Sequence, residues 1–484
     1  MLERLFRRRA RVPADVRARV ERLPRTPTFA FVTNDRAAVR DVAYPAMEVV
    51  EDLAHATAEF VVFVTPGEMV AADALVAFAE RIATAPDVDV VYSDEVGSDG
   101  DRFHKPDWSP ELLLAQPYAL RLTAMRRELV TAAGGLRAAA GRAQEWDLLL
   151  RVTERARRVE HVAELLCRGV RARELDEDAR RVVGEAAARR GVRATVARCP
   201  HAPVFALSVE PHERPPVTIV VPTRDRLDLV RRCVDSVLAR TEYPCFVVQV
   251  VDNGSVEPAT LAQFDAWRRD PRVVIRRDDR PFDYAALMND AVAAATTPLV
   301  LFLNNDTEVI GERWLDEMVG WIGLPGIGAV GAKLYYENDT VQHAGVVLGI
   351  GGVATHGHKG APRNAPGYHG ILHCVRDVSA ATGACLLTRR DLFTRLGGFD
   401  RDLRVAYNDV DYCLRVRRDG ERVLVTPFAE LYHFEGKSRG DDSRGQRRFD
   451  REIALMQQRW GPLLQNDPFY NPHLSLRATD YRLR

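Results

Sequence analysis

Residues 217–255 read VTIVVPTRDRLDLVRRCVDSVLARTEYPCFVVQVVDNGS. An apolar, β-branched run opens the stretch, apolar residues then recur at helical spacing, and a second apolar run, FVVQVV, follows. The order predicts strand, helix, strand. The alternation continues through VVIRR (273–277), an Ala-rich helix over about 284–295, and LVLFL (299–303). Continuous apolar strands separated by helices are typical of parallel sheets, so we predict an α/β fold for the second half.

Composition limits the classes of protein that need to be considered. A length of 484 residues predicts two or three domains. Lys and Arg number 68, as do Asp and Glu, and this zero net charge argues against a nucleic-acid partner. No apolar run approaches the roughly 18 to 20 residues that cross a bilayer. Seven scattered cysteines without metal or redox spacing predict a reducing, cytoplasmic environment.

The first half is a weak copy of the second. Four pairs of segments match, and they occur in the same order in both halves. They are VVFVTPGE (61–68) with VLFLNNDT (300–307), RRELVTAAGGL (126–136) with RRDLFTRLGGF (389–399), AQEWDLLLRV (143–152) with YNDVDYCLRV (407–416), and AELLC (163–167) with AELYH (429–433). We therefore expect tandem copies of one fold. The expected parts are a basic segment over 1–23, a first module over 24–200, a Pro-rich linker over 201–216, and a second module over 217–484 that ends in a helix and a tail.

Oxygen-bearing side chains follow two of the predicted strands. Asp252 ends FVVQVVD, at the edge where open α/β sheets bind ligands, although Asp-Asn-Gly is also a common turn. Asn304, Asn305 and Asp306 follow LVLFL, and such a loop suits Mg²⁺ or Mn²⁺. A helix cap is the alternative role for this loop.

A third cluster joins carboxylates to a histidine. Asp409 and Asp411 lie two residues apart, and His433 follows Asp411 by 22 residues. A carboxylate that takes a proton from a hydroxyl group and a histidine that completes a metal shell would act together beside a diphosphate. Five further histidines between 343 and 373 match no zinc motif, so we interpret that segment as a long loop.

Taken together, the motifs of the second half resemble those of family 2 glycosyltransferases of the GT-A fold, of the kind that builds bacterial surface polysaccharides. The resemblance rests on PTRDR (222–226), VVDNGS (250–255), FDYAALMN (282–289), LFLNNDTEV (301–309), TGACLLTRR (382–390), GGFD (397–400), NDVDYCLR (408–415) and LYHFEGKSRG (431–440), in family order. YSDE (92–95), FHKPDWSPELLL (103–114) and the tail DPFYNPHLSL (467–476) resemble parts of two-module members. Nearly the whole chain is covered.

The resemblance implies a role for each matching residue. Asp252 would contact the nucleotide base, Asp306 and His433 would hold Mn²⁺ or Mg²⁺, and Asp409 would be the catalytic base, with Asp411 as the second candidate. The other implied nucleotide-sugar contacts are Pro222, Thr223, Arg224, Asn289, Asn304 and Asn305, and those on the acceptor side are Gly383, Ala384 and Asn408. Family members commonly have Glu-Asp at 408 and 409 and a DxD motif at 304–306, so this chain lacks one carboxylate at each place.

The implied reaction is metal-dependent, inverting transfer of a sugar from a nucleotide-diphosphate donor to a glycan or lipid-linked glycan. The sequence comparison places Gly67 opposite Asp306, Glu145 opposite Asp409 and Cys167 opposite His433, so we interpret the first module as degenerate. A sugar nucleotidyltransferase would need a Gly-rich phosphate loop that PTRDR does not supply. A non-catalytic scaffold or glycan-binding protein made of two degenerate modules is the alternative from a different class.

The N-terminal segment LERLFRRRARVPADVRARVERL (2–23) is rich in arginine, with apolar residues at loosely helical intervals. A cationic, partly apolar helix suits peripheral contact with the inner face of the plasma membrane. An Arg-rich leader packed on the first module is the alternative. The sequence leaves both open.

Overall fold

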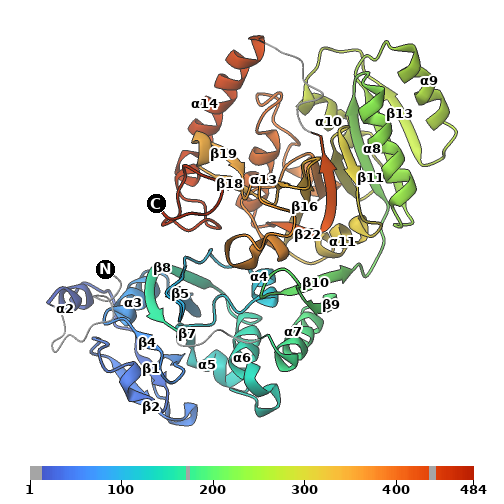
Figure 1. Cartoon of the computed structure of the whole chain (residues 1–484). Helices are drawn as coiled ribbons and strands as arrows, with labels where there is room; N and C mark the ends of the chain where they lie inside the picture. The colour runs from blue at the N-terminus through green and yellow to red at the C-terminus, as the bar shows by residue number, and fades with distance from the viewer. Residues whose placement is uncertain (1–13, 170–174, 435–442) are drawn as a thin grey trace.

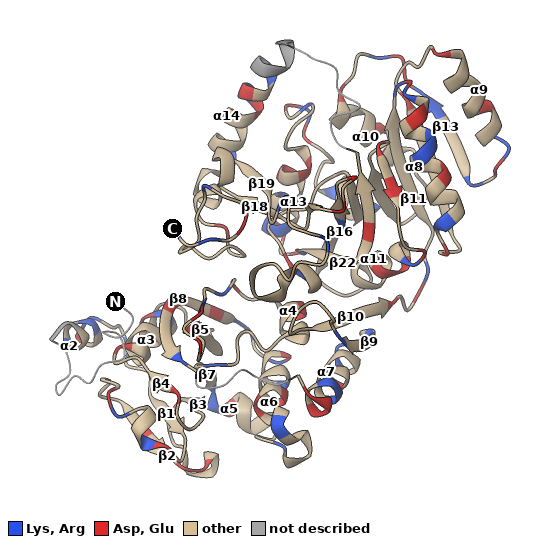
Figure 2. Ribbon diagram, in the orientation of Figure 1, with Lys and Arg blue, Asp and Glu red and all other residues tan. Residues whose placement is uncertain are grey.

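The computed structural model describes residues 14–169, 175–434 and 443–484 (Figure 1). Two α/β modules lie one against the other, each built on its own curled sheet, and the tandem α/β prediction is confirmed. Basic and acidic residues are interspersed over both modules (Figure 2). All seven cysteines are free thiols.

The second module is built on a ten-stranded sheet in the order β13-β12-β11-β14-β21-β16-β22-β15, with β17 paired to β16 and β20 to β22. The predicted strands β11 (Val217–Thr223), β12 (Phe246–Asp252), β13 (Val273–Arg277) and β14 (Leu299–Leu303) are parallel. The remaining strands are β15 (Thr307–Val309), β16 (Ile327–Tyr335), β17 (Val341–His343), β20 (Arg376–Asp377), β21 (Cys385–Arg389) and β22 (Arg422–His433), with β18 (Val346–Leu348) and β19 (Ala354–His356) forming a separate pair. The helices are α8 (Leu227–Arg240), α9 (Pro258–Trp267), α10 (Tyr284–Ala293), α11 (Trp314–Ile322), α12 (Arg390–Arg395), α13 (Asn408–Arg418) and α14 (Ser443–Gln465).

The first module repeats this strand path without a counterpart of β13. Its sheet runs β2-β1-β3-β7-β5-β8-β4, with β6 paired to β5. The strands are β1 (Phe29–Val32), β2 (Met47–Val50), β3 (Phe60–Phe63), β4 (Met69–Val70), β5 (Val90–Val96), β6 (Arg102–Phe103), β7 (Thr123–Arg126) and β8 (Val159–Arg168). The helices are α2 (Ala14–Glu21), α3 (Ala74–Thr84), α4 (Pro110–Ala115), α5 (Arg127–Ala132), α6 (Gln144–Thr153) and α7 (Glu177–Arg189).

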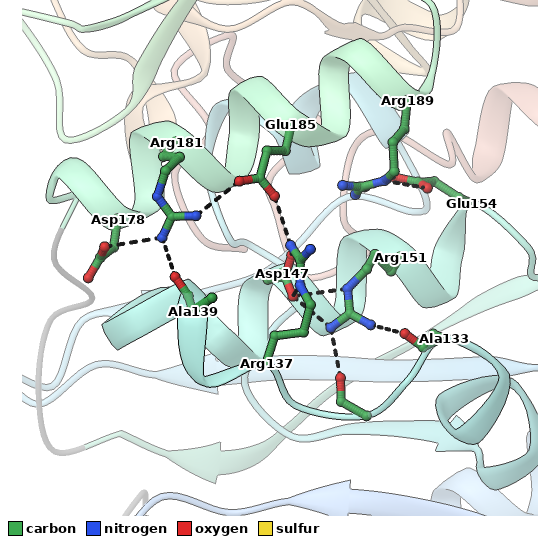
Figure 3. A network of polar contacts seen from close by, with 11 residues as sticks. Ala133, Arg137, Ala139, Asp147, Arg151, Glu154, Asp178, Arg181, Glu185 and Arg189 are labelled. Atoms are coloured by element: carbon green, nitrogen blue, oxygen red, sulfur yellow. Dashed lines mark hydrogen bonds and ion pairs between the residues drawn. The ribbon is translucent and has the colours of Figure 1, made fainter.

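The same polar clasp occurs in both modules. In the first, Arg151 of α6 pairs with Asp147 one turn earlier and donates to the carbonyls of Ala133 and Gly135 (Figure 3). In the second, the Arg415 guanidinium of α13 lies 2.7 Å from the Asp411 carboxylate and donates to the carbonyls of Leu396 and Gly398 at 2.6 and 2.7 Å. These are the residues that the internal sequence comparison aligns. Each clasp ties a helix to the Gly-Gly turn that precedes it.

The connection between the modules differs from the expected linker. Within 201–216 lies strand β10 (Phe205–Glu210), which pairs antiparallel with β9 (Arg193–Arg198). Phe205 and Leu207 join the apolar core of the first module, whereas Val209 joins that of the second. Flanking Pro and His residues hide this period-two pattern in the sequence. One strand therefore belongs to both cores, and the connection is packed rather than loose.

Buried polar contacts also join the modules. Arg422 of the second module pairs with Glu111 of the first. Burial alone would raise the pKa of Glu111, but Arg422 and Arg190 lower it to about 2. Asn471 of the C-terminal tail crosses to the first module and donates to the Asp94 carboxylate at 3.0 Å. The second module is therefore held to the first along both its body and its tail.

The described part of the N-terminal segment packs on the first module. Val16 of α2 is buried in that module's core, and Arg19 pairs with Glu80 of α3 at 2.7 Å. This packing agrees with the leader interpretation for 14–21, while residues 1–13 of the proposed membrane segment lie outside the described residues. Within the ranges that the structure describes, no helix has the length and apolar character needed to cross a membrane.

Glu317 of α11 fastens β10 to the second module. Its carboxylate accepts hydrogen bonds from the Val209 N–H at 2.8 Å, the Ser208 hydroxyl, the Trp321 indole at 2.8 Å and the Thr426 hydroxyl at 3.0 Å. The side chain is buried, and burial raises its pKa to about 7. The folded protein therefore retains this proton at a pH where an ordinary glutamate has lost it.

The raised pKa of Glu317 predicts a pH dependence of stability. Between pH 4.5, the ordinary pKa, and about 7, the folded state binds more protons than the unfolded state, so the contribution is complete below 4.5 and lost toward 7. We expect the stability of the wild type relative to Glu317→Gln to fall across this window by on the order of 3 kcal/mol. Thermal unfolding of both proteins from pH 4 to 8 measures this. A pH-independent difference would contradict the assignment.

The clasp predicts that Asp411 matters for folding. Asp411→Asn leaves Arg415 without its carboxylate partner, whereas Arg459 keeps its pair with Asp400. Breaking a buried pair of this kind costs about 3 kcal/mol. Urea unfolding measures the loss, and Asp147→Asn is the matched test of the other clasp. Asp409→Asn is the control, because Asp409 accepts from backbone N–H groups and is half-buried. Equal destabilisation by Asp409→Asn and Asp411→Asn would contradict this account.

Candidate functional site

The proposed donor-binding residues lie where the parallel strands end. Thr223 of β11 and Asp252 of β12 are register partners, so their side chains reach the same edge of the sheet. Asp252 accepts from the Ser255 N–H at 2.8 Å and pairs with Arg277 of β13 at 2.6 Å. Asn305 donates to the Thr223 hydroxyl at 2.9 Å and so joins the β14 loop to the β11 loop. Pro222 lies within β11, half-buried, and Arg224 is exposed just beyond Thr223.

Asp225 organises this edge, a role that the sequence interpretation missed. It has a left-handed backbone (φ 49°), and its carboxylate accepts from the N–H groups of Val256 and Glu257, both at 2.8 Å. The Ser255 hydroxyl in turn accepts from the Asp225 N–H at 2.7 Å. These bonds fix the loop that follows Asp252. The tendency of Asp to bond nearby backbone in turns was the available signal.

Asp306 and His433 meet as predicted from their motifs. Thr307 of β15 pairs with His433, the last residue of β22, and this register places the preceding Asp306 beside the imidazole. The Asp306 carboxylate lies 3.1 Å from His433 Nε2, and both side chains are buried. The Asn304 amide lies 3.3 Å from the same nitrogen.

Gln342 of β17 orients the imidazole and was not foreseen. Its side-chain oxygen lies 2.7 Å from His433 Nδ1, and its amide nitrogen donates to the His433 carbonyl. An oxygen acceptor at Nδ1 places the ring proton there and directs Nε2 toward Asp306. Gln342 lies more than 90 residues before His433, and no local motif marks it.

Asp306 and His433 supply only one carboxylate and one imidazole as possible metal ligands, which limits how a cation could bind. Among residues 14–169, 175–434 and 443–484, no group of three or more His, Cys, Asp or Glu side chains could hold an ion. Mg²⁺ beside nucleotides commonly takes one or two carboxylates and completes its shell with phosphate and water. Asp306 and His433 therefore fit a cation that binds together with a diphosphate, rather than one held by protein alone. The histidine-rich segment, expected as a loop, instead contains the short strands β17, β18 and β19.

Asp409 forms the second pole of the site. It lies in the first turn of α13, and its carboxylate accepts from the Gly383 N–H at 2.8 Å and the Val410 N–H at 2.8 Å. Burial raises its pKa above the usual aspartate value. The Asn304 N–H donates to the Ala384 carbonyl at 3.1 Å, so the backbone of Gly383 and Ala384 links the Asp409 pole to the Asp306 pole.

The side chains of three predicted site residues, Asp411, Asn289 and Asn408, form hydrogen bonds within the protein that hold the fold together. The Asp411 carboxylate is fully buried and is bound by Arg415, Arg459 and the Trp460 indole. The Asn289 amide is bound through both its atoms to the backbone of Phe399, at 2.8 Å each. Asn408 is buried and donates to the Val405 carbonyl. Asp409 therefore stands as the base candidate of the pair.

The corresponding place in the first module is filled differently. Val70 pairs with Cys167 as Thr307 pairs with His433, so strand register places Met69 opposite Asp306, where the sequence comparison had placed Gly67. Met69 and Cys167 therefore stand in place of the carboxylate and the imidazole of the second module.

Arg121 occupies the first-module position that corresponds to Ala384 in the repeated motif. Its guanidinium pairs with Glu68 and Glu95, each at 2.8 Å. A fixed cation therefore neutralises carboxylates at this edge of the first sheet, which agrees with the degenerate interpretation.

Comparison with known proteins yields one family match. Residues 218–397 match the model of Glycosyl transferase family 2. These residues contain β11, β12, β14 and the Gly383–Ala384 backbone described above.

Two curated proteins are similar over most of the chain. An uncharacterized protein of Sinorhizobium fredii is 40% identical over 85% of this chain and 48% of its own length. The O-antigen biosynthesis protein RfbC of Myxococcus xanthus is 38% identical over 90% of this chain and 35% of its own length. The chain thus spans about half or less of these relatives.

Solved structures give weaker likenesses. The mannosyltransferase PcManGT of Pyrobaculum calidifontis, in complex with GDP-Man and Mn²⁺, has a TM-score of 0.39 at 19% identity, over 53% of this chain and 69% of its own. GalNAc-T7 with UDP, GalNAc and Mn²⁺ has a TM-score of 0.41 at 14% identity, over 52% and 50%. The family match identifies residues 218–397 as a glycosyltransferase family 2 domain.

Proposed function

We propose that the second module transfers a sugar from a nucleotide-diphosphate donor to a hydroxyl group of a glycan or lipid-linked glycan, with inversion. The proposal is supported mainly by the arrangement of a possible metal-binding pair and a possible catalytic base, which are connected by a short stretch of backbone. Asp306 and His433 form one pole, the half-buried Asp409 forms the other, and Gly383 and Ala384 connect them. Asp252 and Thr223, at the ends of β12 and β11, would receive the nucleotide at the carboxyl edge of the sheet.

Asp409 would act as the general base. As the acceptor oxygen forms its bond to the anomeric carbon, its proton passes to the Asp409 carboxylate. The bond from the anomeric carbon to the β-phosphate oxygen breaks, and the nucleoside diphosphate leaves with the electron pair. A single displacement of this kind inverts the anomeric centre. The Gly383 N–H holds the carboxylate in one orientation.

Asp306 and His433 would hold Mn²⁺ or Mg²⁺, and the bound cation would stabilise the charge that develops on the leaving diphosphate. Gln342 keeps Nε2 of His433 directed toward Asp306, and Asn304 and Asn305 tie this loop to its neighbours. The protein's own contribution is thus a buried, oriented pair of ligands.

The first module would be a non-catalytic partner that supports the second. Met69 and Cys167 at the metal positions, and the Arg121 bridge to Glu68 and Glu95, favour this role. The similarity to an O-antigen biosynthesis protein supports a place in surface-polysaccharide synthesis. A lipid-linked acceptor would bring the protein to the inner face of the plasma membrane, as the basic segment 1–23 also suggests.

The proposed base predicts a specific defect in Asp409→Asn. The amide keeps the shape of the side chain and cannot take the proton, so donor binding should persist while transfer falls by at least about 100-fold. Release of nucleoside diphosphate from a panel of UDP-, GDP- and dTDP-sugars, in the presence of acceptor glycans, measures transfer. Glu145→Gln in the first module is the matched control and should leave turnover unchanged. Near-normal transfer by Asp409→Asn would remove it from this role.

The pKa of Asp409 predicts the acidic side of the pH profile. Because burial raises this pKa, the carboxylate gains its proton at a higher pH than an ordinary aspartate does. Activity, which needs the ionised form, should therefore fall as pH drops through this raised pKa. A profile of turnover against pH measures the limb. An acidic limb at the ordinary value of about 3.9 would contradict the assignment.

The metal pole predicts cation-dependent binding of the product. Mn²⁺ with UDP or GDP should raise the unfolding temperature of the wild type, since ligand at 100 times its dissociation constant adds about 2.7 kcal/mol. Asp306→Asn and His433→Gln should lose this stabilisation. Glu312→Gln, an exposed carboxylate on the same segment, should keep it. Equal stabilisation of wild type by the nucleotide in excess chelator would show that no cation is needed.

A further inference from the structure

Exposed aromatic rings occur at two places in the part of the chain that the structure describes. Among its Phe, Tyr and Trp side chains, Phe282 and Phe449 are the exposed ones, at 49% and 39%. Leaving a ring in water forgoes the stabilisation that burial would provide. Exposed apolar groups that gather in one region commonly mark an interaction site.

Phe282 is held against the loop that leads to the proposed base. The next residue, Asp283, caps α10 and pairs with Arg404 at 2.9 Å. The Tyr284 N–H donates to the Arg404 carbonyl, also at 2.9 Å. Arg404 lies five residues before Asp409, so these contacts fix Phe282 beside the approach to α13.

Phe449 of α14, which follows the 404–407 loop in the chain, contacts the same loop. Its ring stacks on Tyr407, with centroids 5.7 Å apart and planes 23° from parallel. One turn later, the buried Glu452 accepts from the N–H groups of Val405 and Ala406 at 3.1 and 2.9 Å. Figure 1 shows α14 running along one side of the second module. The helix is therefore fastened where it presents Phe449 to the 404–407 loop.

Two half-buried rings, those of Tyr407 and Tyr284, lie near Asp409. Tyr407 precedes α13, has a left-handed backbone (φ 59°) and is two residues from Asp409. The Tyr284 hydroxyl lies 3.4 Å from where a β-carbon on Gly383 would be, and Gly383 holds Asp409. Three separate segments that carry aromatic rings thus meet at the loop that leads to Asp409.

We propose that Phe282 and Phe449, together with Tyr284 and Tyr407, form a subsite that binds a sugar ring of the acceptor glycan. The inference rests on the proposed function, because it places the acceptor beside Asp409. A pyranose ring has apolar C–H faces and polar edges, and aromatic rings with a few polar neighbours bind such a shape. Asp283 and Arg404 supply polar groups at this place.

A glycan explains this site better than a lipid surface does. Residues 276–284, which include Phe282, carry three arginines and three aspartates and have no net charge. Contact with anionic membranes is favoured by polybasic segments. Phe449 also lies flat on Tyr407 rather than projecting alone. Arg448 and Arg451 flank Phe449, so the test includes a vesicle arm.

The test measures binding of simple sugars by saturation-transfer-difference NMR. The probes are the methyl glycosides of glucose, galactose, mannose, rhamnose and N-acetylglucosamine, used with the full chain. We expect saturation of at least one probe in the wild type, and a loss of about fivefold in Phe282→Ala and Phe449→Ala. Phe449→Tyr should restore the signal. Leu463→Ala is the matched control, since Leu463 lies on the same helix with the same 39% exposure.

Two further measurements separate this inference from the proposed function. Hydrolysis of nucleotide sugars by water needs no acceptor glycan, so its rate in the wild type tests the transferase proposal separately from glycoside binding. If no nucleotide sugar is consumed and the Phe variants still lose glycoside binding, the transferase proposal fails while the sugar subsite stands. Wild-type glycoside binding in both Phe variants, or no saturation of any probe in the wild type, overturns the subsite. Loss of flotation with phosphatidylglycerol vesicles, without loss of glycoside binding, assigns the rings to membrane contact and also overturns it.

Discussion

Helix α13 is held in place by one guanidinium group. Arg415 joins the buried Asp411 to the carbonyls of Leu396 and Gly398, and Arg459 and Trp460 of α14 bind the same carboxylate. This contact sets where the first turn of α13 begins, and therefore where Asp409 meets the Gly383 N–H. Removing the carboxylate would leave Arg415 without its ion-pair partner, whereas Arg459 would keep Asp400. Losing one partner of a pair that involves a buried carboxylate is costly. The repeated clasp in the first module indicates that the interaction belongs to the fold itself rather than to catalysis.

The two modules share a fold and differ in the polar groups at the sheet edge. In the second module, the small residues Gly383 and Ala384 link Asp409 to the loop that carries Asp306. In the first, the long side chain of Arg121 extends from the equivalent of position 384 and neutralises Glu68 and Glu95. A fixed cation of this kind stabilises a fold, because it satisfies buried carboxylates, and it removes the need for a bound ion. The first module thus has the interactions of a structural partner.

The two modules are also joined by direct contacts. Strand β10 contributes to both apolar cores, Glu111 and Arg422 form a buried ion pair across the modules, and Asn471 of the tail reaches Asp94. Such contacts are lost together if one module is removed, so the second module depends on the first for part of its stability. The aromatic residues proposed to bind the acceptor lie on segments of the second module, on the α10 and α14 sides of the 404–407 loop.

Local pattern alone was sufficient for the parallel strands from β11 to β14, for the duplication, and for the motifs that contain Asp252, Asp306, Asp409 and His433. Periodicity and turn preferences depend on residues that are close together in the chain, so they can be recognised from the sequence alone. The β10 strand was missed because its partners in burial come from both modules, although its own alternation was present. Strand register alone placed Asp306 at 3.1 Å from His433, and the distant Gln342 behind it. Tertiary packing likewise separated Asp409, held by backbone N–H groups, from Asp411, bound by arginines, because two carboxylates in one motif differ only in what surrounds them.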